Sequence, residues 1–143
     1  GSLARLSIVW GGNYYQLPLA RCWLVWDKLT PPNFTIADAE LAWTNLDKCA
    51  RIFRKSPVRQ NQGNGKHHPT QKSVELMEWC LSFLDGEMPV MDCMMGSGTT
   101  GVAAMKVGKR FVGVEKNPEY FAVAAKRIEA AAKSGKQGQL CFQ

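Results

Sequence analysis

Acidic and glycine residues at positions 92 to 101 have the types and spacing of a small-ligand site. The stretch reads Asp92-Cys93-Met94-Met95-Gly96-Ser97-Gly98-Thr99-Thr100-Gly101. Its glycines follow the pattern G-x-G-x-x-G, which lets a backbone turn tightly and approach a ligand closely. In a dinucleotide site, a phosphate binds at the start of the helix that follows such a loop. The carboxylate of Asp92 at the mouth of the loop would repel phosphate and would attract a cation, such as an ammonium or a sulfonium.

A second carboxylate, Glu115, ends the next apolar segment of the chain. Residues 109–115 predict a buried strand, and an acid at the end of that strand can accept hydrogen bonds from both ribose hydroxyls of an adenosine. Asp92 and Glu115 together would bracket the cationic and ribose ends of S-adenosylmethionine. Two alternatives remain open, namely a glycine turn beside a solvated surface acid, and a nicotinamide dinucleotide site with Glu115 as its ribose acid.

The elements around this loop predict an α/β fold. Pro89–Met91 is typical of a short buried strand, and apolar residues at helical spacing follow the loop from position 102 to 107. A helix is predicted over Thr70–Asp85, with Thr70 as its cap and Gly86 at its end. Another helix is predicted to begin at Asn117-Pro118 and to run to Gly135.

The first third of the chain predicts further strands, joined by a proline-containing connection at residues 31–33 that favours an antiparallel hairpin at a sheet edge. These strands are expected at Leu6–Trp10, Cys22–Asp27, Leu41–Trp43 and Ala50–Phe53. The chain is therefore expected to be one domain, residues 1–143. Its parts would be a hairpin half at 1–54, a basic loop at 55–68, a ligand-binding half at 69–135 and a tail at 136–143.

Composition supports a globular protein of a reducing compartment. The chain has 143 residues, of which 45% are hydrophobic and 21% charged, so it is neither disordered nor membrane-spanning in character. No signal-peptide pattern or long apolar run is present. The cysteines are odd in number and form no C-x-x-C pair, which predicts free thiols and no zinc site. The five cysteines are Cys22, Cys49, Cys80, Cys93 and Cys141.

The net charge of +6 is concentrated in one segment of the chain. No acidic residue occurs between Lys48 and Val74, and the part from Ser56 to His67 is rich in Gly, Asn and Gln, which predicts a mobile loop. A basic loop of this kind attracts a phosphate backbone with salt-sensitive affinity. The alternative is an ordinary solvated loop. The residues predicted to contact DNA are Arg51, Arg54, Lys55, Arg59 and Lys66.

Three blocks of the sequence, read together, resemble one known family. They are His68-Pro69-Thr70-Gln71-Lys72, the loop from Asp92 to Thr100, and Gly113-Val114-Glu115-Lys116-Asn117-Pro118-Glu119-Tyr120-Phe121. In this order they are similar to the cofactor half of an amino-group DNA methyltransferase, in the class whose catalytic region precedes its cofactor region. Upstream stretches extend the resemblance from about Ile8 to Ile128. These stretches are Trp10–Tyr15, Trp23–Lys28 and Ala39–Trp43.

The resemblance implies a fold, a cofactor and a substrate. The fold would be a Rossmann-like S-adenosylmethionine-dependent methyltransferase fold, with a doubly wound sheet and a terminal antiparallel hairpin. The cofactor would be S-adenosyl-L-methionine, and the substrate the exocyclic amine of adenine or cytosine in DNA. A bacterial or phage-encoded protein of the cytoplasm is implied. The implied cofactor-binding residues are His68, Thr70, Gln71, Lys72, Asp92, Cys93, Met94, Gly96, Ser97, Gly98, Thr99, Thr100, Glu115 and Lys116.

The catalytic tetrapeptide of that family, D-P-P-Y or N-P-P-Y, does not occur in the sequence. Pro31-Pro32 follows Thr30 and precedes Asn33, and we interpret it as a loop and not as a displaced active site. We therefore assign no catalytic residue and no metal ligand. The expected protein is a truncated, inactive cofactor-binding part of such an enzyme. The alternative is a non-catalytic remnant that binds DNA or protein through the basic loop.

The missing segment would carry a strand that lies in the middle of the family's sheet, so we expect an incomplete sheet. An absent central strand leaves two unpaired strand edges, which a stable monomer tolerates poorly. We expect the gap to be closed in one of three ways. A further segment could complete the sheet, the strands ending at Asp92 and Trp10 could pair directly, or a second chain could contribute in a homodimer.

Overall fold

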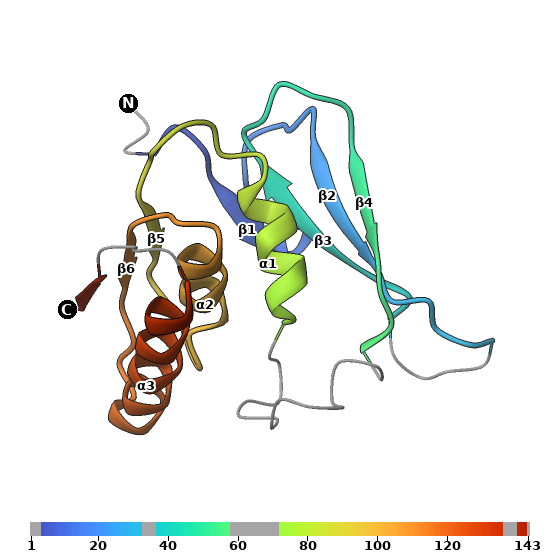
Figure 1. The fold of residues 1–143 in the computed structure, drawn as a ribbon. Helices are drawn as coiled ribbons and strands as arrows, with labels where there is room; N and C mark the ends of the chain where they lie inside the picture. The colour runs from blue at the N-terminus through green and yellow to red at the C-terminus, as the bar shows by residue number, and fades with distance from the viewer. Residues whose placement is uncertain (1–3, 33–36, 58–71, 136–139, 143) are drawn as a thin grey trace. The chain divides into compact units, whose positions relative to one another are not determined.

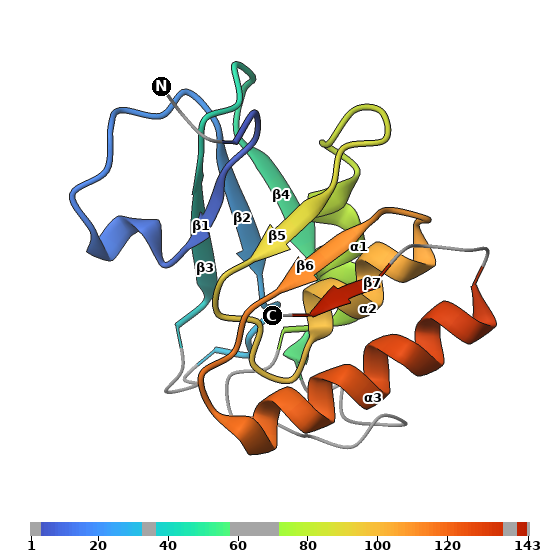
Figure 2. The ribbon, with the colours of Figure 1, turned by 90° about the vertical axis from the view of Figure 1, so that its left-hand side faces the viewer.

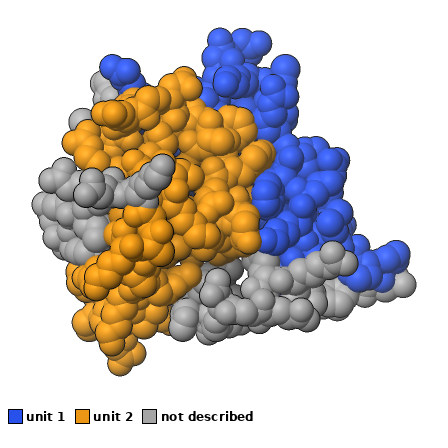
Figure 3. Space-filling view, in the orientation of Figure 1, with its two compact units in different colours: residues 1–63 blue, residues 64–143 orange. Residues whose placement is uncertain are grey.

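The computed structural model describes residues 4–32, 37–57, 72–135 and 140–142. It has a mixed α/β composition, as the sequence predicts, and divides into two compact units, residues 1–63 and 64–143 (Figures 1 and 3). Each unit has its own sheet. Each unit is therefore described by itself.

The first unit is a four-stranded sheet in the order β1-β3-β2-β4 (Figure 1). Strand β3 pairs antiparallel with both β1 and β2, and β4 pairs parallel with β2. The predicted hairpin is confirmed by the antiparallel β2–β3 pair, but these are the inner strands of the sheet among the described residues, and not an edge. A short 3-10 helix, η1, covers Gly12–Tyr14. The strands are β1 (Ile8–Trp10), β2 (Trp23–Asp27), β3 (Ala39–Thr44) and β4 (Arg51–Arg54).

Burial in β2 alternates with the strand period, since Leu24 and Trp26 are buried and their neighbours are only partly covered. One face of the strand therefore supplies the apolar contacts of this unit. The indole N–H of Trp26 donates to the carbonyl of Lys55 at 2.8 Å, so the buried ring also has its polar atom satisfied. This contact fixes the end of β4 beside β2.

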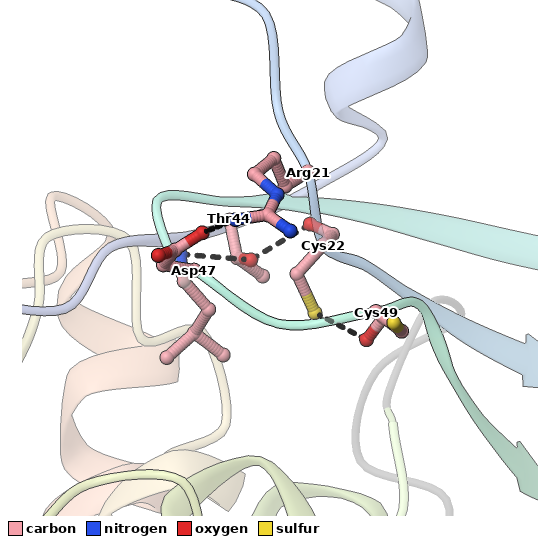
Figure 4. A network of polar contacts seen from close by, with 6 residues as sticks. Arg21, Cys22, Thr44, Asp47 and Cys49 are labelled. Carbon is pink, nitrogen blue, oxygen red and sulfur yellow. Dashed lines mark hydrogen bonds and ion pairs between the residues drawn. The ribbon is translucent and has the colours of Figure 1, made fainter.

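A polar network ties the start of β2 to the segment between β3 and β4 (Figure 4). The buried Thr44 hydroxyl donates to the carbonyl of Cys22 at 2.8 Å, and the Cys22 thiol donates to the carbonyl of Cys49 at 3.3 Å. Arg21 forms an exposed ion pair with Asp47. Cys22 is thus a buried thiol with a structural hydrogen bond, as the prediction of free cysteines allows.

The second unit is built on a three-stranded parallel sheet in the order β5-β6-β7 (Figure 2). Helices connect the successive strands because parallel neighbours require a crossover. The sequence predicts a tail over residues 136–143, but Leu140–Phe142 form β7 beside β6. The pairing with β7 covers an edge of β6 that would otherwise be open. The elements are α1 (Val74–Leu81), β5 (Val90–Asp92), α2 (Thr99–Lys106), β6 (Phe111–Gly113), α3 (Pro118–Ser134) and β7.

Helix α1 differs from its prediction at both ends. Thr70, the predicted cap, lies outside the described residues, and the observed cap is Ser73, whose hydroxyl accepts from the N–H of Leu76 at 3.1 Å. The helix ends at Leu81, because the following residues tighten into turns, with the N–H of Leu84 donating to the carbonyl of Leu81 at 3.0 Å. The ammonium of Lys109 donates to the carbonyls of Leu84 and Gly86 at 3.1 and 2.7 Å. These two carbonyls, in the turns after the helix, therefore have a hydrogen-bond donor.

Helix α2 is the centre of this unit and packs against α1, α3 and the sheet (Figure 2). A side chain at Gly101 would place its Cβ 2.4 Å from Ile128 Cδ1 and 2.7 Å from Phe111 Cε1, so only glycine permits this close approach. Helix α3 confirms its predicted start, since the Asn117 side chain accepts from the N–H of Glu119 at 2.8 Å. The buried residues of α2 are Thr99, Gly101, Val102, Ala103, Ala104 and Met105.

Strands β1 and β5, the two predicted neighbours of a missing strand, belong to separate sheets. Among the described strands, β5 pairs with β6 alone, so it forms one edge of its sheet. Within the described ranges, no helix combines the length and apolar character needed to span a membrane.

Candidate functional site

Strands β5 and β6 are adjacent and parallel (Figure 2). Asp92 is the last residue of β5, and Glu115 follows the end of β6 by two residues. Asp92 ends β5 opposite Gly113 of β6. Backbone hydrogen bonds continue past the strands, since the N–H of Val114 donates to the carbonyl of Asp92 at 2.9 Å and the N–H of Met95 donates to the carbonyl of Val114 at 3.0 Å. The loop after β5 is therefore joined to the segment that carries Glu115. Ligands of open α/β sheets bind at this end of the strands.

Asp92 has one carboxylate oxygen engaged in the turn that begins the loop. Its Oδ1 accepts from the N–H of Met94 at 3.0 Å, and the side chain is half-buried. Within the described residues no donor contacts the second oxygen, Oδ2. Asp92 can therefore shape the turn and still present a negative charge at the mouth of the loop.

Glu115 accepts a backbone hydrogen bond on each of its two oxygens. Its Oε1 accepts from the N–H of Asn117 at 2.9 Å, and its Oε2 accepts from the N–H of Gly96 at 2.9 Å. The Asn117 contact is the largest cause of a lowered pKa of this carboxyl, the Gly96 and Lys116 N–H groups lower it further, and partial desolvation opposes them. Glu115 is an ionised acceptor whose remaining lone pairs can accept from ligand hydroxyls.

The glycine loop turns through left-handed backbone at two positions, Gly96 with φ 53° and Gly98 with φ 79°. The N–H of Gly98 donates to the carbonyl of Met95 at 2.8 Å, which closes the turn before α2 begins. A Cβ at Gly98 would lie 2.8 Å from the Cβ of Ala124 on α3. The G-x-G-x-x-G pattern is therefore confirmed as a tight turn that packs directly on a helix.

The other predicted ligand residues of the loop fall into two groups. Cys93 and Met94 are exposed, Met94 to 86% of its surface. Lys116, which follows Glu115 in the sequence, is also exposed. Ser97 and Thr99 are buried inside the turn, and the hydroxyl of Thr100 donates to the Sδ of Met77 at 3.7 Å. The exposed group can reach a ligand through side chains, whereas the buried group contributes to the shape of the loop.

The predicted segment before α1 is described only at its end. Lys72 is half-buried. Burial raises the pKa of the Cys80 thiol to about 12, and the positive charge of Lys72 acts in the opposite direction. His68, Thr70 and Gln71 lie outside the described residues. The described cysteines, Cys22, Cys49, Cys80 and Cys93, are all free thiols. Among the described residues no cluster of three or more His, Cys, Asp and Glu side chains could hold a metal ion.

The residues predicted to contact DNA belong mainly to β4 and its end, in the first unit. Arg51 is exposed, and the Nε of Arg54 lies 3.3 Å from the Oδ2 of Asp27 in an exposed ion pair. The N–H of Lys55 donates to the carbonyl of Asp27 at 3.0 Å. Arg59 and Lys66 lie outside the described residues.

Sequence reasoning did not single out Arg127 of α3, which contacts the glycine loop. Its Nη1 donates to the carbonyl of Ser97 at 2.5 Å, and the side chain is half-buried. Burial lowers the pKa of its guanidinium from the usual value. The available signal is its place in the sequence, since Arg127 interrupts the apolar face formed by Ala124 and Ile128.

Comparison with protein families and known sequences gives consistent matches. The model of the DNA methylase family N6_N4_Mtase matches residues 21–126. The type II methyltransferase M2.DpnII of Streptococcus pneumoniae is 32% identical over a 135-residue alignment that covers 75% of this chain and 50% of that protein. M2.LlaDCHI of Lactococcus lactis subsp. cremoris is 28% identical, with 78% and 52% covered. The chain thus spans about half the length of these curated relatives.

Solved structures match in the same way. The crystal structure of an M1.HpyAVI–SAM complex aligns with a TM-score of 0.56 and 34% identity, over 73% of this chain and 60% of that one. The cytosine-N4-specific PvuII DNA methyltransferase aligns with a TM-score of 0.56 over 82% of this chain and 58% of that one. Its identity is 17%, so this second match supports the fold alone.

Proposed function

Because this chain belongs to the DNA methylase family, we propose that it contains the part of such an enzyme that binds S-adenosyl-L-methionine. The observation that carries this proposal is the pair of carboxylates, Asp92 and Glu115, that follow adjacent parallel strands on either side of one glycine loop. The M1.HpyAVI–SAM complex, at 34% identity, supports the same ligand. We also propose that the complete protein has the doubly wound sheet with a terminal hairpin that the family resemblance implies.

In this proposal, each acid recognises a different part of the cofactor. Asp92 would attract the cationic methionine end through Oδ2, because its Oδ1 already accepts from Met94 within the turn. Glu115 would accept from the ribose hydroxyls with the lone pairs that Gly96 and Asn117 leave available. Once bound, the cofactor supplies an electrophilic methyl group for transfer to an amine.

Exposed side chains of the loop complete the proposed pocket. Cys93 and Met94 would cover the cofactor with small or flexible apolar groups, which adapt readily to a ligand. Lys116, exposed after Glu115, and Lys72, half-buried before α1, are further candidates. His68, Thr70 and Gln71 stay proposed ligands on the family resemblance alone.

Methyl transfer itself is proposed only for an assembly that includes the family's D/N-P-P-Y segment. The 143 residues contain no such tetrapeptide, and we assign no catalytic residue to them. The strand that carries this segment would pair with the edge of β5 that faces away from β6. A further segment of protein or a second chain would supply it. Native mass spectrometry and gel filtration test the second-chain form, because a compact, stably folded monomer would contradict it.

The first test is a calorimetric titration of the chain with S-adenosyl-L-methionine. Asp92→Asn is the sharpest variant, since an amide oxygen can still accept from Met94 while the charge is lost. We expect its affinity to fall about tenfold or more, the size of a charge contact in a partly covered site. Asp85→Asn, an exposed acid of the same unit, is the matched control and should bind as the parent does.

The outcomes of this titration separate the proposal from its alternatives. An Asp92→Asn variant that folds and binds as tightly as the parent would remove Asp92 from the site. Binding of a nicotinamide dinucleotide in preference to S-adenosyl-L-methionine would favour the oxidoreductase alternative. A parent chain that binds neither would contradict a preformed pocket in residues 64–143.

DNA is the proposed substrate, and the exposed basic residues of β4 are its proposed contacts. Arg51 is the clearest, because it is exposed and starts an outer strand of the described sheet. Arg54 shares its charge with Asp27, so it should contribute less. Removing one phosphate contact lowers the slope of log K against log salt by about 1. Arg51→Ala should show this change, whereas the ion-paired Arg21→Ala, as control, should not.

A further inference from the structure

Helix α3 contacts the glycine loop through a charged side chain as well as through packing. Ala124 and Ile128 lie against the positions of Gly98 and Gly101, where a Cβ would approach to 3.0 Å or less. Between them in the sequence, Arg127 directs its Nη1 to the carbonyl of Ser97 at 2.5 Å. The helix thus provides a wall and a hydrogen-bond donor to the same four-residue turn.

The acceptor of Arg127 indicates what this contact does. Half-burying a guanidinium is unfavourable, as the lowered pKa of Arg127 reflects, unless the charge gains strong hydrogen bonds. Here the acceptor is a backbone carbonyl, so the contact fixes a peptide plane and not a neighbouring side chain. The same peptide is also held at its N–H, since Gly98 donates to the carbonyl of Met95 at 2.8 Å.

A negative charge, the carboxylate of Glu115, holds the adjoining part of the turn. The Oε2 of Glu115 accepts from the N–H of Gly96 at 2.9 Å, which fixes the peptide between Met95 and Gly96. A carboxylate from the end of β6 and a guanidinium from α3 therefore hold the two peptides on either side of the Gly96–Ser97 bond. Hydrogen bonds to charged groups are about twice as strong as neutral ones, so the pair should rigidify a turn that two left-handed glycines leave flexible.

We propose that Arg127 is a positioning residue, which holds the Gly96–Gly98 turn in its ligand-binding shape without contacting the ligand. The inference rests on the proposed function for its consequence, since a correctly shaped turn would bind S-adenosyl-L-methionine without first having to be ordered. Preorganisation of this kind raises affinity by reducing the entropy lost on binding. The turn would be fixed in the ligand-free chain by residues from two different elements.

The first test uses the ligand-free chain, so it does not depend on the identity of the ligand. Amide hydrogen exchange by NMR is compared in the parent, Arg127→Met and Lys126→Met, an exposed neighbour that loses the same charge. We expect the Gly96 and Gly98 amides to exchange about tenfold faster in Arg127→Met, with amides of α1 unchanged. Exchange as slow as in the parent would overturn the proposal, and so would equal acceleration in Lys126→Met.

The second test measures the consequence by calorimetry with S-adenosyl-L-methionine below the melting temperature. Arg127→Met should bind about tenfold more weakly, and Arg127→Lys, which keeps a charged donor, should recover part of this loss. Equal affinity in Arg127→Met and the parent would show that Arg127 serves stability alone and would overturn the positioning role. A parent chain that does not bind would contradict the proposed function, while the exchange rates still decide whether Arg127 holds the turn.

Discussion

Two arginines of the first unit are used differently from Arg127 of the second. Arg21 pairs with Asp47 and Arg54 with Asp27, both in exposed ion pairs. In the second unit Arg127 and Glu115 bind backbone groups of one glycine turn. Exposed ion pairs contribute little to stability, because water competes for both partners. Charges on backbone groups instead fix a local conformation, which is the requirement of a binding loop.

The glycines of the second unit extend this comparison. Gly98 has left-handed backbone and lies against Ala124, whereas Gly86 has similar backbone, φ 66°, with no atom within 4 Å of the place that a Cβ would take. One glycine is required by conformation and by contact, and the other by conformation alone. The difference in stability lost on substituting each glycine with alanine therefore measures how tightly the turn is packed on α3.

The largest effect on stability is expected for Gly98→Ala. Its Cβ would lie 2.8 Å from the Cβ and 3.0 Å from the Cα of Ala124, and backbone cannot move aside as a flexible side chain does. Conformational strain and overpacking together should lower the free energy of unfolding by about 3 kcal/mol. Urea denaturation of the parent and the variant gives this value.

Gly86→Ala is the matched control for that substitution, since it adds the same methyl group to left-handed backbone in open space. Strain alone should lower the free energy of unfolding by about 1 kcal/mol. Equal losses in the two variants would mean that α3 does not press on the turn, and the contrast between the two glycines would disappear.

A smaller effect should distinguish the two cysteines that are exposed among the described side chains, Cys93 in the glycine loop and Cys49 in the first unit. If S-adenosyl-L-methionine occupies the proposed pocket, it should slow alkylation of Cys93 about tenfold and leave Cys49 unaffected. Alkylation at about pH 8, followed by peptide mass spectrometry, measures both rates. Cys80 serves as an internal reference, because burial raises the pKa of its thiol to about 12 and keeps it unreactive. Equal protection of both exposed thiols would indicate a general change in the protein.

The pH dependence of stability should report the backbone contacts of Glu115. Its pKa is lowered in the folded chain, first by the Asn117 N–H, so its stabilising contribution is fully present above the ordinary carboxyl pKa of 4.5. That contribution is lost as the pH falls through the lower folded value. Glu115→Gln should be less stable than the parent near neutral pH by about 1 kcal/mol, and the difference should shrink in acid.

Thermal unfolding between about pH 7 and pH 3 measures this difference. Glu87→Gln is the control, since Glu87 is an exposed acid of the same unit. If the difference in stability between the parent and Glu115→Gln were the same at every pH, the ionised carboxylate would not be what holds the turn.

The sequence predicts the local structure of the candidate site better than its long-range contacts. The strand, the glycine turn and the helix are confirmed as local structure, because each depends on a few consecutive residues. The cap of α3 at Asn117 is confirmed for the same reason. Arg127 contacts Ser97 across 30 positions of the chain, and no local pattern marks such a pair. Strand β7 is not predicted from the sequence, because its three residues are defined as a strand by their pairing with β6, which lies far from them in the chain.

The smallest effect is expected for Arg54→Ala in β4. The two side chains of its ion pair with Asp27 are 62% and 35% exposed, so the loss should be about 0.5 kcal/mol or less and should vanish in high salt. Asp27→Ala should cost more, because Oδ1 of Asp27 also accepts from the N–H of Leu29 at 2.9 Å, where the backbone is left-handed with φ 51°. Asp27→Asn, which keeps that acceptor, isolates the charge. If Arg54→Ala cost as much as the loss of a charged group in the glycine turn, the charges of β4 would also be fixing local structure, and their assignment to DNA would lose its physical basis.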